Sequence, residues 1–188
     1  EISVGSTQDI RAPSIIQLSD GHFVILDVDS SKARIRKYNS STFQLMGTAY
    51  LRNADDSADL TPDTTSHISD SHQLAVQTTR DRLLAVAPDT AGRVILNVWD
   101  NDLTLDRTFE ITSSAEYYGS LSVDSTGNFV YFGAHGQWGD PDAYYYAHDS
   151  TGTPSWTKAI NTGEENSSDV EWFHEVAFLS NDHLVFTS

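Results

Sequence analysis

Tight turns recur at four places along this chain, and a large apolar residue follows each turn two positions later. The turn residues are Gly21, Asp81, Gly127 and Asp182, and the apolar residues are Phe23, Leu83, Phe129 and Leu184. A short strand-like stretch precedes each turn. A longer, nearly continuous apolar stretch follows it, which is typical of strands covered on both faces. Because no long stretch has the apolar spacing of a helix, we expect an all-β fold.

The four turns lie 60, 46 and 55 residues apart, so the chain contains an internal repeat. The repeat units span about residues 6–51, 72–111, 116–160 and 170–188. Four short strands per unit are typical of one β-propeller blade, and a closed propeller needs about four blades or more. We therefore expect residues 1–188 to form about three and a half four-stranded blades of a single, longer propeller. In the alternative, residues 1–12 close a four-bladed ring, although one short segment cannot replace two missing strands.

Two turns in the third unit carry a recognisable motif. Residues 123–133 read Val-Asp-Ser-Thr-Gly-Asn-Phe-Val-Tyr-Phe-Gly and resemble the Asp-Ser-x-Gly-Asn-aromatic repeat of bacterial secreted β-propeller proteins. Residues 148–156 resemble that family's Asp-x-x-Gly-x-x-x-Trp turn and, more distantly, the Trp-ending repeat of quinoprotein-like propellers. The resemblance implies that Asp holds the turn, that Gly supplies a left-handed residue, and that Trp156 packs between blades. It implies an architecture and transfers no catalytic residue.

The charge of the chain is strongly negative. Twenty-seven acidic residues face 11 basic ones, for a net charge of −16. This charge repels nucleic acid phosphates and anionic lipids, and no apolar run is as long as a membrane-spanning helix. We therefore expect neither nucleic acid binding nor membrane insertion. Cysteine is absent, which excludes disulfides and thiolate metal sites. An acidic domain at the cell surface, outside the cell or in the periplasm fits this composition.

An acidic loop between the first two units is the candidate metal site. Its potential ligands are Asn53, Asp55, Asp56 and Asp59, within a stretch over 52–71 that has few apolar residues and little expected structure. Their oxygens suit calcium, but the loop lacks the central Gly and the terminal Glu of an EF-hand. The alternative is a solvated acidic loop, since Asp is common in turns. We expect no cofactor, with calcium as the one candidate ion.

Aromatic and histidine residues in the third unit give a candidate ligand-binding surface. The residues are Trp138, Tyr144, Tyr146, His135 and His174. We expect Trp138 to lie in a glycine-rich loop, and exposed aromatic rings beside Asp or Asn bind sugars by stacking and hydrogen bonding. In the alternative, the alternating tyrosines pack between blades. His135 and His174 would form a polar funnel if folding brought them to the central channel.

The function expected from these features is a non-enzymatic extracellular module. It would be structural or adhesive, and would present loops to a glycan, a protein ligand or neighbouring copies in an assembly. One alternative is a hydrolase or lyase with an active site across the propeller channel. The other is a calcium-stabilised surface-layer or appendage subunit. No Gly-x-Ser-x-Gly segment is present, which gives nucleophilic serine catalysis no support.

Overall fold

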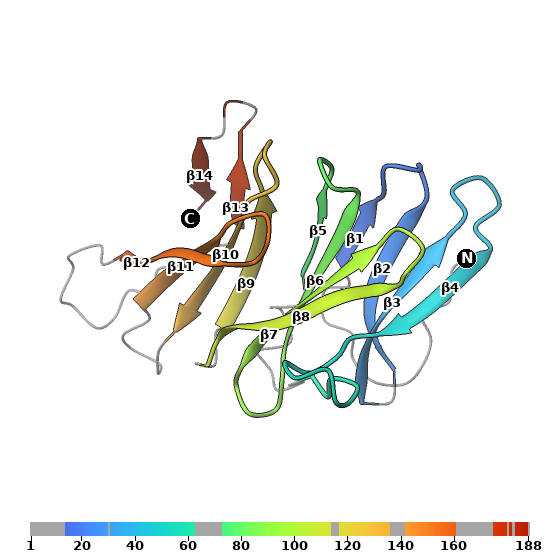
Figure 1. Ribbon diagram of the computed structural model, residues 1–188, viewed down its shortest axis with the longest axis horizontal. Helices are drawn as coiled ribbons and strands as arrows, with labels where there is room; N and C mark the ends of the chain where they lie inside the picture. The colour runs from blue at the N-terminus through green and yellow to red at the C-terminus, as the bar shows by residue number, and fades with distance from the viewer. Residues whose placement is uncertain are drawn as a thin grey trace.

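The computed structural model describes residues 14–29, 31–62, 73–113, 117–135, 142–160, 175–179, 181 and 183–187. Every regular element in these ranges is a β-strand, and none of their residues belongs to an apolar helix of membrane-spanning length. The strands form three four-stranded sheets and one two-stranded sheet, each an antiparallel meander in chain order (Figure 1). We name these sheets blades 1 to 4.

Blades 1 to 3 have four strands each, and the described part of blade 4 has two. Blade 1 contains β1 (Ser14–Gln17), β2 (Phe23–Asp29), β3 (Lys32–Tyr38) and β4 (Leu45–Tyr50). Blade 2 contains β5 (Gln73–Gln77), β6 (Arg82–Pro88), β7 (Val94–Asp100) and β8 (Leu105–Thr112). Blade 3 contains β9 (Tyr117–Val123), β10 (Phe129–His135), β11 (Asp142–His148) and β12 (Pro154–Ile160). Blade 4 contains β13 (Glu175–Phe178) and β14 (Leu184–Thr187).

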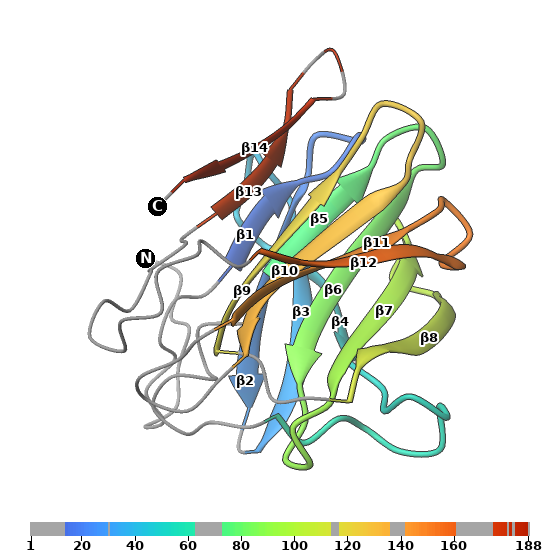
Figure 2. The same cartoon turned by 90° about the vertical axis from the view of Figure 1, so that its left-hand side faces the viewer.

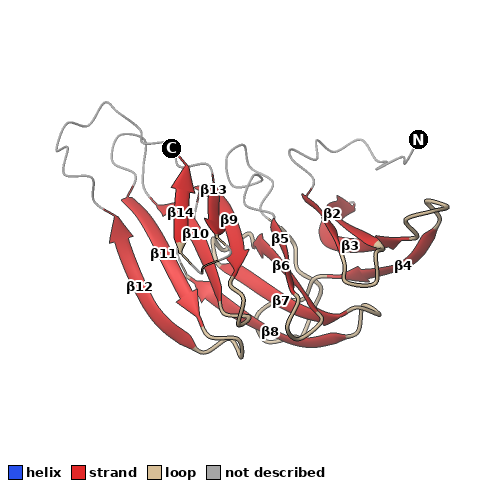
Figure 3. Ribbon diagram, turned by 90° about the horizontal axis from the view of Figure 1, so that it is seen from above, coloured by secondary structure: helices blue, strands red, loops and turns tan. Residues whose placement is uncertain are grey.

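The blades are arranged radially, with the first strand of each one innermost. Strand β1 contacts β5, β5 contacts β9, and β9 contacts β13, and these strands run side by side in Figure 2. From above, the sheets stand one beside the next along a curved row (Figure 3). This arrangement is that of a β-propeller and confirms the expected fold class.

Apolar cores fill the spaces between successive blades. The core between blades 1 and 2 includes Leu26, Leu83 and Trp99, and the core between blades 2 and 3 includes Leu84 and Phe129. Leu83 and Leu84 are neighbours in β6, yet they belong to different cores because successive side chains of a strand point to opposite faces. Both are at most 1% exposed, and burying a leucine side chain contributes about 1.5–3 kcal/mol.

Aspartate side chains hold the tight turns, as the turn motif predicts. The Asp124 carboxylate accepts hydrogen bonds from the backbone N–H groups of Thr126 and Asn128, both at 2.8 Å. Burial opposes ionisation of Asp124, but hydrogen bonds from Thr126 and Asn128 outweigh it and lower its pKa. Five further aspartates accept a backbone N–H two residues ahead in the same way: Asp20, Asp55, Asp89, Asp102 and Asp149. Much of the acidic excess therefore serves turn structure.

Left-handed residues complete these turns. Gly21, Gly127 and Gly152 have φ angles of 84°, 90° and 89°. Asp81 occupies the equivalent position in blade 2 with a φ of 55°, because Asp tolerates this region better than most side chains. The turn of blade 2 thus keeps a left-handed residue although that residue is Asp81 and not glycine. Asp182, the fourth turn residue, lies outside the described residues.

Two sequence expectations are wrong. Trp156 is 47% exposed on β12, the outermost strand of blade 3, rather than packed between blades. The acidic stretch is ordered over residues 52–62: Leu60 is 1% exposed, and its N–H donates to the Leu51 carbonyl at 2.7 Å. Leu60 anchors this segment to blade 1 because its own carbonyl accepts the Ala33 N–H at 3.2 Å. Residues 63–72 lie outside the described residues.

Two glycine substitutions separate backbone strain from steric conflict. Alanine at Gly21 or Gly127 must adopt a positive φ, which costs about 1–2 kcal/mol. A Cβ at Gly21 meets no atom within 4 Å, whereas one at Gly127 lies 2.7 Å from Thr79 Oγ1 and 3.1 Å from the buried Gln77 side chain. We expect G127A to destabilise the protein by a further 1–3 kcal/mol or so relative to G21A, measured by urea unfolding. Equal losses would contradict the described contact between this turn and blade 2.

Candidate functional site

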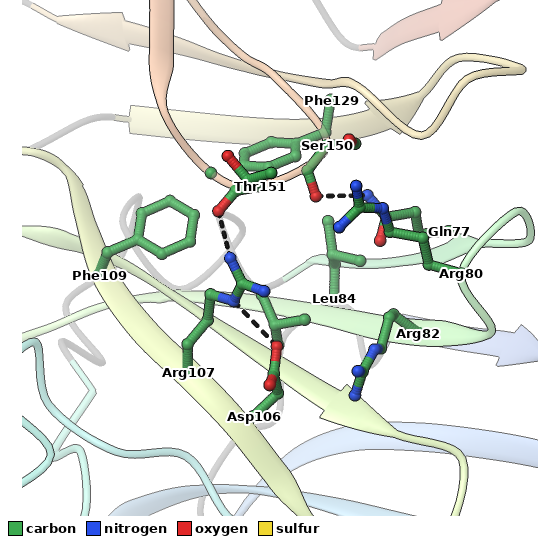
Figure 4. Close-up of a pocket in the computed structure, with 12 residues that line it drawn as sticks. Gln77, Arg80, Arg82, Leu84, Asp106, Arg107, Phe109, Phe129, Ser150 and Thr151 are labelled. Carbon is green, nitrogen blue, oxygen red and sulfur yellow. Dashed lines mark hydrogen bonds and ion pairs between the residues drawn. The ribbon is translucent and has the colours of Figure 1, made fainter.

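A cleft of about 280 Å³ opens between blades 2 and 3 (Figure 4). Blade 2 contributes the end of β5, the β5–β6 turn, and parts of β6, β7 and β8. Blade 3 contributes the start of β10 and the β11–β12 turn. The cleft therefore lies where the apolar core between these blades ends and their turns begin.

The floor of the cleft is apolar. Leu84, Val98 and Phe129 line it and are at most 7% exposed. Phe109 of β8 is half-buried and forms a wall, with its ring centroid 5.9 Å from that of Phe129. An apolar floor with an aromatic wall is the usual lining of a small-molecule site.

Polar side chains of blade 2 reach backbone carbonyls of blade 3 across the cleft. Arg107 donates to the Thr151 carbonyl and, through Nε, to Asp106 at 2.9 Å (Figure 4). The Gln77 side chain is buried and donates from Nε2 to the Ser150 carbonyl at 3.2 Å and to the Gly127 carbonyl. These bonds fix the two blades relative to each other and orient Arg107 at the rim.

Two more arginines complete the rim. Arg82 pairs with Asp100, its cross-strand partner in β7. Arg80 lies exposed in the β5–β6 turn, and within the described part of the chain no carboxylate lies within 4 Å of its guanidinium. Sequence reasoning missed this cleft. The available signal was limited to Arg80 and Arg82, two of only 11 basic residues, which lie two positions apart; nothing in the sequence joins Arg107 to them.

The tyrosines predicted for ligand binding lie in β11, outside the cleft. Tyr144 and Tyr146 are half-buried, and their rings stack with centroids 6.3 Å apart. Tyr146 also packs against the core between blades 2 and 3, near Tyr131 at 6.5 Å, as in the packing alternative. Tyr145 points to the opposite face, where burial raises its pKa to about 12.

The other predicted binding residues are only partly described. His135 is the last residue of β10, the second strand of blade 3 from the inside. Trp138 and His174 lie outside the described residues. A polar funnel of His135 and His174, and sugar stacking on Trp138, stay predictions.

Arg52 engages the acidic loop that was predicted to hold calcium. Its guanidinium donates to Asp56 at 2.8 Å and to Asp59 at 2.7 Å. Asn53 and Asp55 accept the backbone N–H of Ser57 at 2.9 and 3.0 Å. Within the described ranges, no three or more His, Cys, Asp or Glu side chains are grouped to hold a metal ion. Calcium binding and a solvated acidic loop both stay predictions here, and the pairing of Arg52 with Asp56 and Asp59 favours the second, because a calcium ion would compete with Arg52.

A buried histidine lies behind the aromatic lining of the cleft. The His148 ring stacks on Phe129 at 5.0 Å and lies 5.7 Å from the Phe109 ring. His148 is 3% exposed, and its Nδ1 has no hydrogen-bond partner among the described residues. Desolvation lowers the pKa of His148, although a backbone hydrogen bond at Tyr146 and the charge of Asp149 oppose the shift. Protonation of this ring therefore weakens the packing beneath the cleft.

No protein-family model matches this chain, and no curated protein matches it in sequence. Solved structures match its fold. The Dos1 propeller shares 9% identity at a TM-score of 0.57, over 93% of this chain and 41% of that one. The α-L-arabinofuranosidase Arb93A of Fusarium graminearum was solved with an iminosugar inhibitor. It shares 10% sequence identity with this chain at a TM-score of 0.58, and the match covers 98% of this chain and 60% of Arb93A. An auxiliary nutrient-binding protein of Bacteroides thetaiotaomicron shares 7% sequence identity at a TM-score of 0.52, and the match covers 92% of this chain and 44% of that protein.

These likenesses concern the fold alone, because the identities are low. The chain spans about two fifths to three fifths of the length of the three structures. They include a binding protein and a glycosidase, so the fold does not decide between binding and catalysis. The chain is a β-propeller segment.

Replacing His148 tests the packing beneath the cleft. Because the pKa of His148 is lowered in the folded state, the unfolded chain binds more protons near its ordinary value of about 6.5. Its contribution to stability is therefore present above that pH and declines as pH falls through it. We expect the melting temperature to fall less in H148F than in the wild type between about pH 7.5 and 5.5. Identical profiles would contradict a buried, neutral His148.

Calcium titration tests the acidic loop. Because Arg52 already pairs with Asp56 and Asp59, we expect millimolar calcium to leave the melting temperature unchanged relative to magnesium at equal ionic strength. A rise specific to calcium would contradict this and favour the calcium-stabilised alternative. The variant D55N would then show whether the loop is responsible.

Proposed function

We propose that this chain is a non-enzymatic, ligand-binding propeller module of an extracellular or cell-surface protein, and that it binds its ligand in the cleft between blades 2 and 3. A glycan or a protein is the proposed partner, in keeping with an adhesive or ligand-presenting role. The observation that carries the proposal is the combination of an apolar floor with converging polar groups in one cavity. Leu84, Val98 and Phe129 form the floor, and Arg107 and Gln77 are held at the edge by bonds to blade 3.

The composition of the cleft favours binding over hydrolysis. Glycoside cleavage generally uses two carboxyl groups, one of which acts as an acid. Among the described residues that line the cleft, Asp106 is the one carboxylate, and it pairs with Arg107. The described lining thus supplies one of the two carboxyl groups that this chemistry generally uses. A hydrolase or lyase site across the propeller channel is a separate hypothesis, and an activity screen on the same saccharides tests it.

A glycan array with aromatic variants tests the proposed function. We expect the wild type to bind a subset of saccharides and F109A to lose at least about tenfold in affinity, because it removes an aromatic wall of the cleft. F43A is the matched control, since Phe43 is 59% exposed in the β3–β4 turn of blade 1. We expect F43A to bind like the wild type.

The variant W138A separates the cleft from the glycine-rich loop predicted from sequence. If W138A lost binding while F109A kept it, the ligand would bind at that loop and the cleft assignment would be wrong. If turnover of a bound saccharide were detected, the non-enzymatic assignment would be wrong. Circular dichroism and thermal melting of each variant distinguish loss of binding from loss of fold.

A further inference from the structure

Among the residues that line the cleft, basic side chains outnumber acidic ones. Three arginines line it in a chain of net charge −16 with 11 basic residues. Two carboxylates balance two of these cations, since Arg107 pairs with Asp106 and Arg82 pairs with Asp100. Arg80 has no described carboxylate within 4 Å, so the cleft keeps one cation in excess.

This excess cation lies in an exposed turn at the rim of the cleft, beside the apolar floor. Like charges around one cleft repel one another, although water and salt screen part of this repulsion at an exposed rim. Figure 4 shows Arg80 and Arg82 on one side of the cleft and Arg107 on the other. A bound anion would relieve the repulsion, and a guanidinium fork matches the two oxygens of a carboxylate.

Arg107 has donors left for a ligand. A guanidinium carries five N–H donors, and the described contacts of Arg107 go to the Thr151 carbonyl and to Asp106. These two contacts hold Arg107 in a fixed orientation at the rim. Because its orientation is set before binding, little side-chain entropy is lost when a ligand accepts the remaining donors.

The other lining residues favour a sugar as the carrier of the anion. The half-buried Phe109 ring offers a flat apolar surface of the kind that packs against the C–H face of a pyranose. Asp106 and Thr151 supply acceptors for ring hydroxyls at the rim. A volume of about 280 Å³ lies near the lower end of small-molecule pockets, which suits one sugar residue.

We propose that the cleft binds a carboxylate-bearing sugar residue, a hexuronate, with Arg80 as the anchor of its carboxylate and Phe109 beneath its ring. This inference rests on the proposed binding function and names the ligand class. A hexuronate combines the three features that the cleft matches: one negative charge, an apolar ring face and several hydroxyl groups. The negative field of the whole chain opposes long polyanions, so a single uronate residue or the end of a chain is the favoured ligand.

Isothermal titration calorimetry with galacturonate tests the proposal, with galactose as its neutral counterpart. We expect galacturonate to bind at least about tenfold more tightly than galactose, and the difference to shrink with added salt. R80Q removes the anchor from an exposed turn and should weaken galacturonate binding about tenfold or more. R93Q is the matched control, because Arg93 pairs with Asp89 in the β6–β7 turn, away from the cleft lining. It changes the net charge equally and should bind like the wild type.

Each other outcome overturns a named part of the proposal. Equal binding of galactose and galacturonate, or equal weakening by R80Q and R93Q, would exclude recognition of the carboxylate. Displacement of galacturonate by inorganic phosphate at equal concentration would show a general anion site and exclude the sugar. Absence of galacturonate binding would exclude the ligand class. The proposed binding function is tested independently of these outcomes, by the glycan array with F109A. Thermal melting of R80Q verifies that this variant keeps its fold.

Discussion

The packing of one blade against the next determines the rest of this structure. A single four-stranded sheet exposes two faces, and here the facing sides of successive blades bury each other. Leu83 and Leu84 show this most directly, because adjacent residues of β6 are buried in two different cores. Stability is therefore shared between neighbours, as in other repeat proteins. The cleft arises where this packing ends: beyond Phe129, the space between blades 2 and 3 is lined by arginine and glutamine.

Part of the acidic composition has a structural role, which the net charge of −16 does not reveal. Asp124 and Asp149 accept hydrogen bonds from turn N–H groups, and Asp27 is buried between Arg34 and Arg36. Such carboxylates are held by local partners and are not available for a cation. The electrostatic field of the chain is negative, but the residues that line the cleft include more basic than acidic side chains. In such a field, a site for an anion must be built from a concentrated group of cations, and positions 80, 82 and 107 provide it.

The strands were predictable from sequence, because a run of apolar residues follows each left-handed turn at Gly21, Asp81 and Gly127 and forms a buried strand there. Which side of a strand is covered was not predictable: Trp156 looks like a core residue, yet its outermost strand leaves it exposed. Leu60 shows the opposite case, because it lies in an acidic stretch and is nevertheless buried. Its backbone hydrogen bonds anchor the 52–62 segment to blade 1. The cleft was missed because Arg80 and Arg107 belong to different turns and strands, and only their placement in space gives them a shared role.

The position of the cleft links ligand binding to the stability of the blade interface. A ligand that contacts Arg80 of blade 2 and Thr151 of blade 3 binds only when the two blades are docked, because each blade supplies part of the site. Such a ligand stabilises the docked state by about 2.7 kcal/mol at a concentration one hundredfold above Kd. His148 reaches the same interface from blade 3, since its ring lies 5.7 Å from the Phe109 ring of blade 2. Protonation of His148 weakens the apolar packing between the two blades, whereas a ligand bound to both blades favours their docking.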